Sequence, residues 1–204
     1  MNIETLFEKY NNSPKGIIQA GSHHAEEYKI YLKYLDHNIL LFEPQPEAFL
    51  TSVEVARKAT VANLALGSFN GLVDLFIPSS HNASASVLVP RLHLLQYPQY
   101  VFDSSIRVHQ VRLDDFMEEC HLHSRYDTLI LDVQGYELEV IKGAVKTMAD
   151  INFVFTEVNR EELYFGCVLF DDLEQFMYAL GFQLLEIEWF GGTWGNAIYG
   201  RNRR

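Results

Sequence analysis

Apolar residues along this chain form two alternating patterns: short unbroken runs, and segments in which they recur at helical spacing. The unbroken runs at 16–20, 39–42 and 60–64 are typical of buried strands. A helical pattern follows the first run, with one apolar face made by Tyr28, Tyr31, Leu32 and Leu35. A second helical pattern covers about 47–57. This alternation predicts βαβ units and an α/β fold with a mostly parallel sheet.

The same alternation resumes after residue 100. Strands are expected at 106–111, at 127–132 and at 151–158, and a short helix from Asp114 to Cys120 separates the first two. The run at 151–158 is almost wholly apolar, as expected for a central parallel strand that is covered on both faces.

The C-terminal part predicts one helix and two strands. Asp171-Asp172-Leu173-Glu174 resembles a capping box, and Gly181 suits the position that follows a helix. The runs at 182–189 and 197–199 flank a glycine-rich turn. They are expected to form an antiparallel pair that closes the sheet.

Two segments break the alternation. Residues 72–77 form a strand pattern after an Asn-Gly turn, which predicts a hairpin with the run at 60–64. Residues 78–100 are weakly periodic and predict a long loop of the kind that is often functional. Our hypothesis is that this loop, with Tyr97, Tyr100 and Phe102 beside it, contacts a substrate or forms a lid; the alternative is a packed surface loop. Residues 1–14 are expected to hold an N-terminal helix.

Composition narrows the class of protein. With 204 residues, 48% of them hydrophobic and 21% charged, the chain predicts one globular domain. A net charge of −11 argues against a nucleic-acid partner or an anionic membrane surface. There is no signal-peptide pattern and no apolar run long enough to span a bilayer. Two widely spaced cysteines predict neither a disulfide framework nor a zinc site. These features lead us to expect a soluble, cytoplasmic protein.

The most informative segment runs from Asp127 to Ala144. It predicts a buried strand that ends at Asp132, a turn at Gly135, and a helix with acidic residues in its first turn. Open α/β sheets bind ligands outside the carboxyl ends of their strands, so Asp132 is expected at a ligand crevice. The structural alternative is that Asp132 caps the following helix.

Two other strand ends carry candidate ligand contacts. Ala20, Gly21 and Ser22 follow the first strand, where a glycine lets a ligand approach the backbone. Glu43 ends the second strand, 22 positions after Gly21, a spacing that fits an acid binding the ribose of an adenine cofactor. The structural alternatives are that Gly21 belongs to a plain turn and that Glu43 is a solvated acid. After the third strand, Leu66 and Gly67 could receive an adenine face or belong to the core.

Three residues are candidates for the chemistry itself. Asp132 and Glu157 end neighbouring strands, where two acids can share a proton, hold a divalent metal or orient a hydroxyl. His23 could act as a general base. The structural alternatives are a salt bridge from Glu157 to Arg160 and polar filling by His23.

Together these residues resemble the FkbM-type methyltransferase family, and the matching segments span nearly the whole chain. They are GIIQAGSHHAEEY (16–28), LLFEPQPEAF (40–49), NLALGSFNG (63–71), ASASVL (83–88), VRLDDF (111–116), LILDVQGYELEVIKGA (129–144) and FTEVNREELYFG (155–166). The resemblance implies a class I, Rossmann-like, three-layer fold that binds S-adenosylmethionine. It also implies that Gly21 lies under the methionine part of the donor, Glu43 binds the ribose, Leu66 contacts adenine, and Asp132 lies near donor and acceptor.

The resemblance implies O-methylation of a hydroxyl on a sugar, glycan or natural product. The sequence departs from the family pattern at Gln19 and at Ala25, where an acid or histidine and a glycine are usual. These departures motivate an alternative, a non-catalytic binding or scaffold module. A third hypothesis, an enzyme that uses a nicotinamide dinucleotide, is disfavoured because the chain lacks the glycines of a dinucleotide fingerprint.

Overall fold

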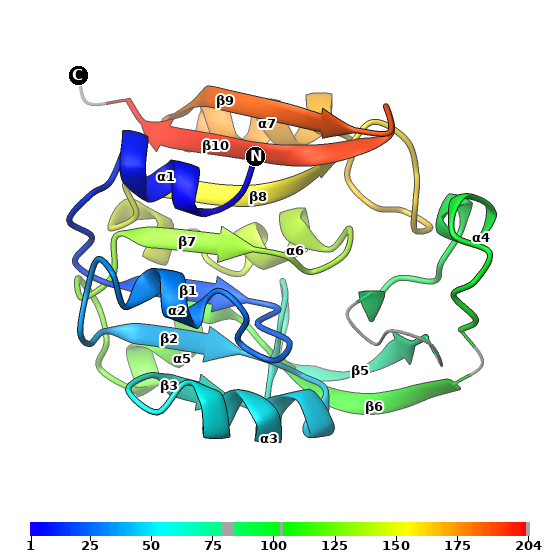
Figure 1. Ribbon diagram of the computed structural model, residues 1–204, viewed down its shortest axis with the longest axis horizontal. Coiled ribbons are helices and arrows are strands. Elements are labelled where there is room, and N and C mark those ends of the chain that lie inside the picture. Colours follow the sequence, from blue (N-terminus) through cyan, green and yellow to red (C-terminus); the bar gives the residue numbers. More distant parts are fainter. Residues whose placement is uncertain (79–83, 103, 203–204) are drawn as a thin grey trace.

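The computed structural model describes residues 1–78, 84–102 and 104–202. Its main sheet has seven strands in the order β3-β2-β1-β7-β8-β10-β9 (Figure 1). Five of them are parallel, and β10 runs antiparallel to both β8 and β9. The predicted parallel sheet with a closing antiparallel pair is confirmed. The strands are β1 (Ile17–Ala20), β2 (Ile39–Phe42), β3 (Thr60–Ala62), β7 (Thr128–Leu131), β8 (Phe153–Asn159), β9 (Phe182–Phe190) and β10 (Trp194–Arg201).

Helices cover both faces of this sheet and make the predicted three-layer sandwich (Figure 1). One layer holds α1 (Glu4–Lys9), α2 (Tyr28–Tyr31) and α3 (Pro46–Val55). The other holds α5 (Leu113–Glu119), α6 (Glu137–Lys142), the 3₁₀ turn η2 (Thr147–Ala149) and α7 (Phe170–Ala179). Within the part of the chain that the structure describes, no helix has the length and apolarity needed to cross a membrane.

The unbroken apolar runs are explained by these two layers. Successive residues of a strand point to opposite faces, so a strand covered on both sides needs apolar residues at every position. In β7, Leu129 and Leu131 pack in the core under α5, α6 and α7. Ile130, between them, packs in the core under α1 and α2. All four residues of β1, β2 and β7 are buried.

A second, three-stranded sheet replaces the predicted hairpin. It contains β4 (Ala65–Leu66), β5 (Gly71–Ile77) and β6 (Ser104–Val111) in the order β4-β6-β5. β5 pairs antiparallel with β6 and not with the run at 60–64, so the hairpin prediction was wrong. That run is broken at Asn63, whose amide donates to the carbonyl of Glu43, and the chain then leaves the main sheet.

The long loop predicted at 78–100 contains regular structure in its described part. It includes α4 (Leu92–Gln96) and two isolated bridges, which join Phe76 to Ser86 and Pro90 to Tyr164. A helix of five residues is too short to show a helical period in the sequence. Residues 79–83 of the predicted loop lie outside the described residues.

Two predictions about helix ends needed correction. The N-terminal helix covers only Glu4–Lys9 of the predicted 1–14, because Asn, Ser and Pro between 11 and 14 are poor helix formers. The capping box was wrong: α7 begins at Phe170 and receives no side-chain cap. Gly181 has φ of +84°, which agrees with its predicted place after the helix.

The sheet brings three strand ends to one level. Ala20 pairs with Phe42 of β2 on one side and with Leu131 of β7 on the other. The next residues, Gly21, Glu43 and Asp132, therefore lie together where the strand order reverses. Ligands of open α/β sheets bind in the crevice at this reversal.

Gly21 lies in direct contact with the backbone of Asp132. Its φ is +77°, and a Cβ at this position would overlap the carbonyl oxygen of Asp132. Gly166 has a similar φ of +72°, but a Cβ there would meet nothing within 4 Å. An alanine at Gly166 would therefore be subject to backbone strain alone, whereas an alanine at Gly21 would also overlap its neighbour.

We expect Gly166→Ala to lower the free energy of unfolding by about 1–2 kcal/mol, the cost of a left-handed alanine. Gly21→Ala should lower it by at least about 2 kcal/mol more, because the backbone must also move apart. Urea unfolding followed by circular dichroism measures both. Equal losses in the two variants would contradict the close approach of Gly21 to Asp132.

Candidate active site

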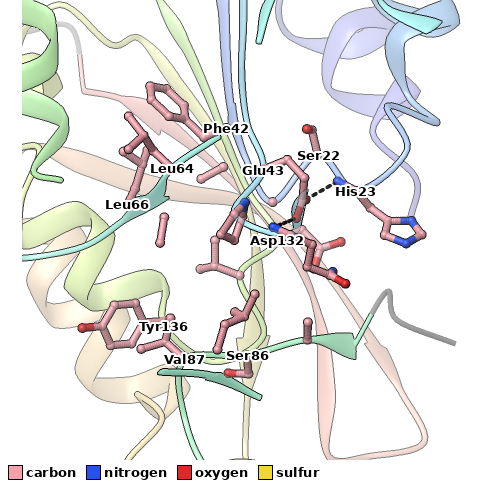
Figure 2. Close-up of a pocket in the computed structure, with 18 of the residues that line it drawn as sticks. Ser22, His23, Phe42, Glu43, Leu64, Leu66, Ser86, Val87, Asp132 and Tyr136 are labelled. Carbon is pink, nitrogen blue, oxygen red and sulfur yellow. Dashed lines mark hydrogen bonds between the residues drawn. The ribbon is translucent and has the colours of Figure 1, made fainter. Parts of the chain in front are cut away.

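A cavity of about 240 Å³ lies at this reversal, outside the ends of β1, β2 and β7 (Figure 2). Six of the seven residues that the sequence proposed for a cofactor line it: Ala20, Gly21, Ser22, Glu43, Leu66 and Asp132. We call it the first cavity. Ser22 adds a buried hydroxyl oxygen that has no hydrogen-bond partner among the described residues.

Gly67, the seventh proposed residue, does not line the first cavity. A Cβ on Gly67 would overlap the side chain of Gln110, and a Cβ on Gly143 would overlap the carbonyl oxygen of Gly67. The structure therefore places Gly67 where the second sheet crosses the C-terminal end of α6.

Glu43 is held rigidly on the wall of the first cavity. Its carboxylate accepts hydrogen bonds from the backbone N–H groups of His23 at 2.7 Å and Gln45 at 2.8 Å, and Figure 2 draws the bond from His23. Burial raises the pKa of Glu43 to about 7, although both backbone hydrogen bonds oppose the rise. An oriented, desolvated carboxylate of this kind can accept hydrogen bonds from the hydroxyls of a ligand.

The opposite wall of the first cavity is apolar. Figure 2 shows side chains from four separate segments there: Phe42, Leu64, Leu66, Val87 and Tyr136. A flat ring system with little charge fits such a surface, because its apolar faces leave water on binding. The predicted place of Leu66 agrees with this arrangement.

The two departures from the family pattern are accommodated by packing. Ala25 has φ of +56°, a left-handed conformation that favours glycine, and its side chain is buried. Gln19 is buried, accepts a hydrogen bond from the Tyr31 hydroxyl and donates one to Glu27. Both residues thus shape the turn behind the first cavity.

Asp132 and Glu157 are joined by a residue that the sequence analysis missed. The Nε2 amide of Gln134 donates to Asp132 at 2.7 Å and, at 3.4 Å, to Glu157. Its Oε1 accepts a hydrogen bond from the Tyr164 hydroxyl at 2.9 Å. A signal was present, since Gln134 stands two positions after Asp132 in the most specific segment.

Both structural alternatives for these acids are wrong. Tyr136 is the N-cap of α6, so Asp132 does not cap the helix. The carboxylate of Glu137 instead accepts the N–H groups of Val133 and Gly135 in the turn. Arg160 lies over the Trp189 ring, at 3.8 Å from its centre, and forms no salt bridge with Glu157.

The acids at this point of the sheet retain protons more readily than ordinary carboxyl groups. Burial, followed by the nearby carboxylates of Glu137 and Asp132, raises the pKa of Glu157 well above its usual range. Asp132 lines both cavities and is solvent-exposed, and the surrounding protein still raises its pKa by desolvation. Such paired acids with perturbed pKa values are typical of sites that move protons.

A second cavity, of about 560 Å³, meets the first at Asp132 and Glu27. Glu157 and Gln134 line the second cavity and not the first. So do Tyr97 and Tyr100 from the segment after α4, two of the three aromatic residues that the sequence proposed for substrate contacts. The third, Phe102, packs in the small core with Leu163 and Tyr164. A group held in either cavity therefore reaches the same carboxylate, that of Asp132.

His23 borders the first cavity mainly through its backbone. In Figure 2 its imidazole points away from Glu43, and its Nδ1 lies 2.8 Å from a carboxylate oxygen of Glu26. With His24 and Glu26 it forms the one group of three or more potential metal ligands detected among the described residues. A metal between Asp132 and Glu157 stays a prediction, and the amide of Gln134 places a hydrogen-bond donor in the gap where that ion would bind.

The family model of the methyltransferase FkbM domain matches residues 18–184, so the chain belongs to this methyltransferase family. It is 34% identical over 138 residues to the 2-O-methyltransferase NoeI of Sinorhizobium fredii, covering 63% of this chain and 56% of that protein. It is 27% identical over 125 residues to the hexuronic acid methyltransferase AglP of Haloferax volcanii, covering 60% and 47%. The chain thus spans about half the length of these relatives.

Solved structures that are named as methyltransferases share this fold. Magnesium protoporphyrin IX methyltransferase (ChlM) from Synechocystis PCC 6803, with bound SAM, matches with a TM-score of 0.54 and 10% identity, over 97% of this chain and 74% of that one. Streptococcus pneumoniae Sp1610 in complex with S-adenosyl-L-methionine matches with a TM-score of 0.53 and 13% identity, over 98% and 72%. At these identities the likeness shows the fold, which confirms the predicted class I architecture.

The buried acids predict an unusual pH dependence of stability. Burial raises the pKa of the fully buried Glu137 to about 7, while its pKa in an unfolded chain is about 4.3. Its stabilising contribution is therefore complete below about pH 4 and is lost as the pH rises through about 7. Glu139, on the same helix, has a lowered pKa because Lys142 and Ser68 bind its carboxylate and outweigh its desolvation.

We expect Glu137→Gln to gain stability relative to the native chain as the pH rises from 5 to 8, by up to about 3 kcal/mol. Glu139→Gln, the matched control, should show no such gain. Guanidinium unfolding at several pH values measures both. If the difference in unfolding free energy between Glu137→Gln and the native chain does not change with pH, this carboxyl ionises in the folded protein as easily as in water.

Proposed function

We propose that this chain is an S-adenosylmethionine-dependent O-methyltransferase whose acceptor is a hydroxyl of a sugar or glycan. The observation that carries the proposal is the meeting of two cavities at Asp132, one suited to an adenosyl donor and the other to a hydroxyl-bearing acceptor. The family supports the reaction class, and the names of the relatives, a 2-O-methyltransferase and a hexuronic acid methyltransferase, support the acceptor class.

The first cavity fits the donor residue by residue. Glu43 would accept hydrogen bonds from the ribose hydroxyls, and the apolar wall with Leu66 would cover the adenine. The backbone at Ala20 and Gly21, which lacks a side chain at its closest point, would lie along the methionine part.

Asp132 would orient the acceptor hydroxyl and take its proton. When bound, the donor supplies a methyl group on a sulfonium centre, and the electron pair of the broken carbon–sulfur bond stays on sulfur. Gln134 holds the Asp132 carboxylate in place, while Glu157, with its strongly raised pKa, would stay protonated and donate to an acceptor oxygen. Positioning supplies the rest of the rate enhancement.

The alternative, a binding module without activity, is not favoured. Gly21, Glu43 and the apolar side chains expected to bind the donor all line the first cavity. The departures from the family pattern at Gln19 and Ala25 are accommodated in the turn next to it. The family match and both relatives are methyltransferases.

Donor binding tests the first cavity alone. We expect calorimetry to detect S-adenosylhomocysteine at micromolar concentration. Glu43→Gln should weaken its binding by about 1–3 kcal/mol, since hydrogen bonds to a charged carboxylate are lost. Glu47→Gln, an exposed acid of α3, is the control and should bind as the native chain does. No heat at millimolar ligand would refute the proposal.

Catalysis tests Asp132. On the glycan that the native chain methylates best, Asp132→Asn should lower kcat at least about 100-fold, the usual contribution of a general base, with donor affinity within about threefold. The control is Asp36→Asn, whose side chain lies at the exposed surface. Mass spectrometry of the methylated product measures turnover, and a near-native kcat in Asp132→Asn would remove that residue from proton transfer.

A further inference from the structure

The second cavity carries information about the acceptor that neither the fold nor the family supplies. Its floor is the sheet, at Ile130 and Leu131 of β7 and at Phe155 and Glu157 of β8. Its walls come from β10, from the segment that contains α4, from residues 1–3 and from the region of β1 and α2. It has more than twice the volume of the first cavity, enough for a ligand of sugar size beside Asp132.

Half-buried aromatic rings form one wall of the second cavity. The indole N–H of Trp194 donates to the hydroxyl of Tyr97 at 3.1 Å, which fixes both rings in the wall. Phe190 packs against Trp194 from behind, with 4.9 Å between ring centres. Rigid aromatic faces of this kind cover the apolar C–H face of a pyranose and leave its hydroxyls at the edge.

Amide and carboxyl groups line the rest of the second cavity. Gln134, Asn196 and Glu157 stand together, since Asn196 of β10 pairs with Glu157 of β8 in the sheet. These side chains offer both donors and acceptors, which is what a set of sugar hydroxyls requires.

The charge of this lining is one-sided. Glu27, Asp132 and Glu157 are acids, and the lining residues that the structure describes include no Lys or Arg. The undescribed residues 79–83 contain neither type in the sequence. The α-amino group of Met1 pairs with Glu188, and burial lowers the pKa of His93, which keeps that imidazole neutral.

A sugar carboxylate in the second cavity would therefore lie beside the Asp132 carboxylate, and the described lining residues include no Lys or Arg to pair with it. Glu157, which stays protonated, supplies no positive charge either. Like charges brought together in a binding site disfavour that ligand and act as a device against it. A neutral sugar loses nothing in the same place, because its hydroxyls find amide and carboxyl partners.

Resting on the proposed function, we infer that the second cavity is the acceptor site and that it selects an uncharged pyranose over a uronic acid. The name of NoeI, a 2-O-methyltransferase, does not specify the charge of its acceptor, whereas AglP is named a hexuronic acid methyltransferase. This chain is thus expected to differ from AglP in acceptor charge.

Matched pairs of acceptors test the inference. The panel consists of methyl glycosides of glucose, galactose and mannose, each with its uronic acid counterpart, which differs only in a carboxylate at C6. With the native chain and labelled donor at neutral pH, the neutral member of at least one pair should have a kcat/KM at least about tenfold above its uronic acid. Preference for a uronic acid, or transfer to no member of the panel, would overturn the inference.

A second arm places the sugar in the second cavity. Trp194→Leu should lower kcat/KM for the preferred acceptor at least about tenfold and leave the donor dissociation constant within about twofold. Trp189→Leu is the matched control, because the chain has two tryptophans and Trp189 lines neither cavity. Unchanged acceptor use in a folded Trp194→Leu chain would place the sugar elsewhere.

Donor calorimetry separates the two levels of failure. If S-adenosylhomocysteine does not bind, the proposed function fails. If it binds while the uronic acids are preferred, the methyltransferase proposal stands and the inferred acceptor is wrong.

Discussion

β1 is hydrogen-bonded in parallel to β2 on one side and to β7 on the other, and the site takes its geometry from this pairing. The register ends three strands at the same level, so a glycine, a glutamate and an aspartate from distant parts of the chain follow at one edge. Gly21 then packs directly on the backbone of Asp132. Each acid takes its position from the strand before it.

Burial of acids at this edge is unfavourable by itself, and the structure offsets it with neutral hydrogen-bond donors and not with cations. Backbone N–H groups hold Glu43 and Glu137, and the amide of Gln134 lies between Asp132 and Glu157. A buried cation would have held these carboxylates firmly ionised. With amide donors alone, the pKa of Glu43 and of Glu137 is about 7, and burial also raises the pKa of Asp132 and of Glu157.

Much of the fold could be predicted from the sequence, because strands buried on both faces leave unbroken apolar runs and helices leave a 3.6-residue period. The exceptions were short or non-local: β4 has two residues, α4 has five, and β5 pairs with a strand far along the chain. The first cavity was largely predictable, since its residues follow strand ends. The sequence placed Gly67 at this cavity, which it does not line, and it missed Gln134, because both residues make their contacts with segments remote in sequence. The second cavity is lined by many segments that are remote from one another in sequence, and no local pattern encodes their meeting.

The second sheet has a consequence for how such enzymes can diverge. β5 and β6 pair along their full length, from Gly71 with Gln110 to Ile77 with Ser104, so the intervening segment leaves and rejoins the sheet at adjacent points. Changing the length of a loop with fixed ends costs little conformational entropy. The stretch from α4 to Tyr100 borders the second cavity and not the first. Insertions there would change the surroundings of the acceptor and leave those of the donor as they are. Homologues could therefore evolve to use different acceptors around an unchanged core.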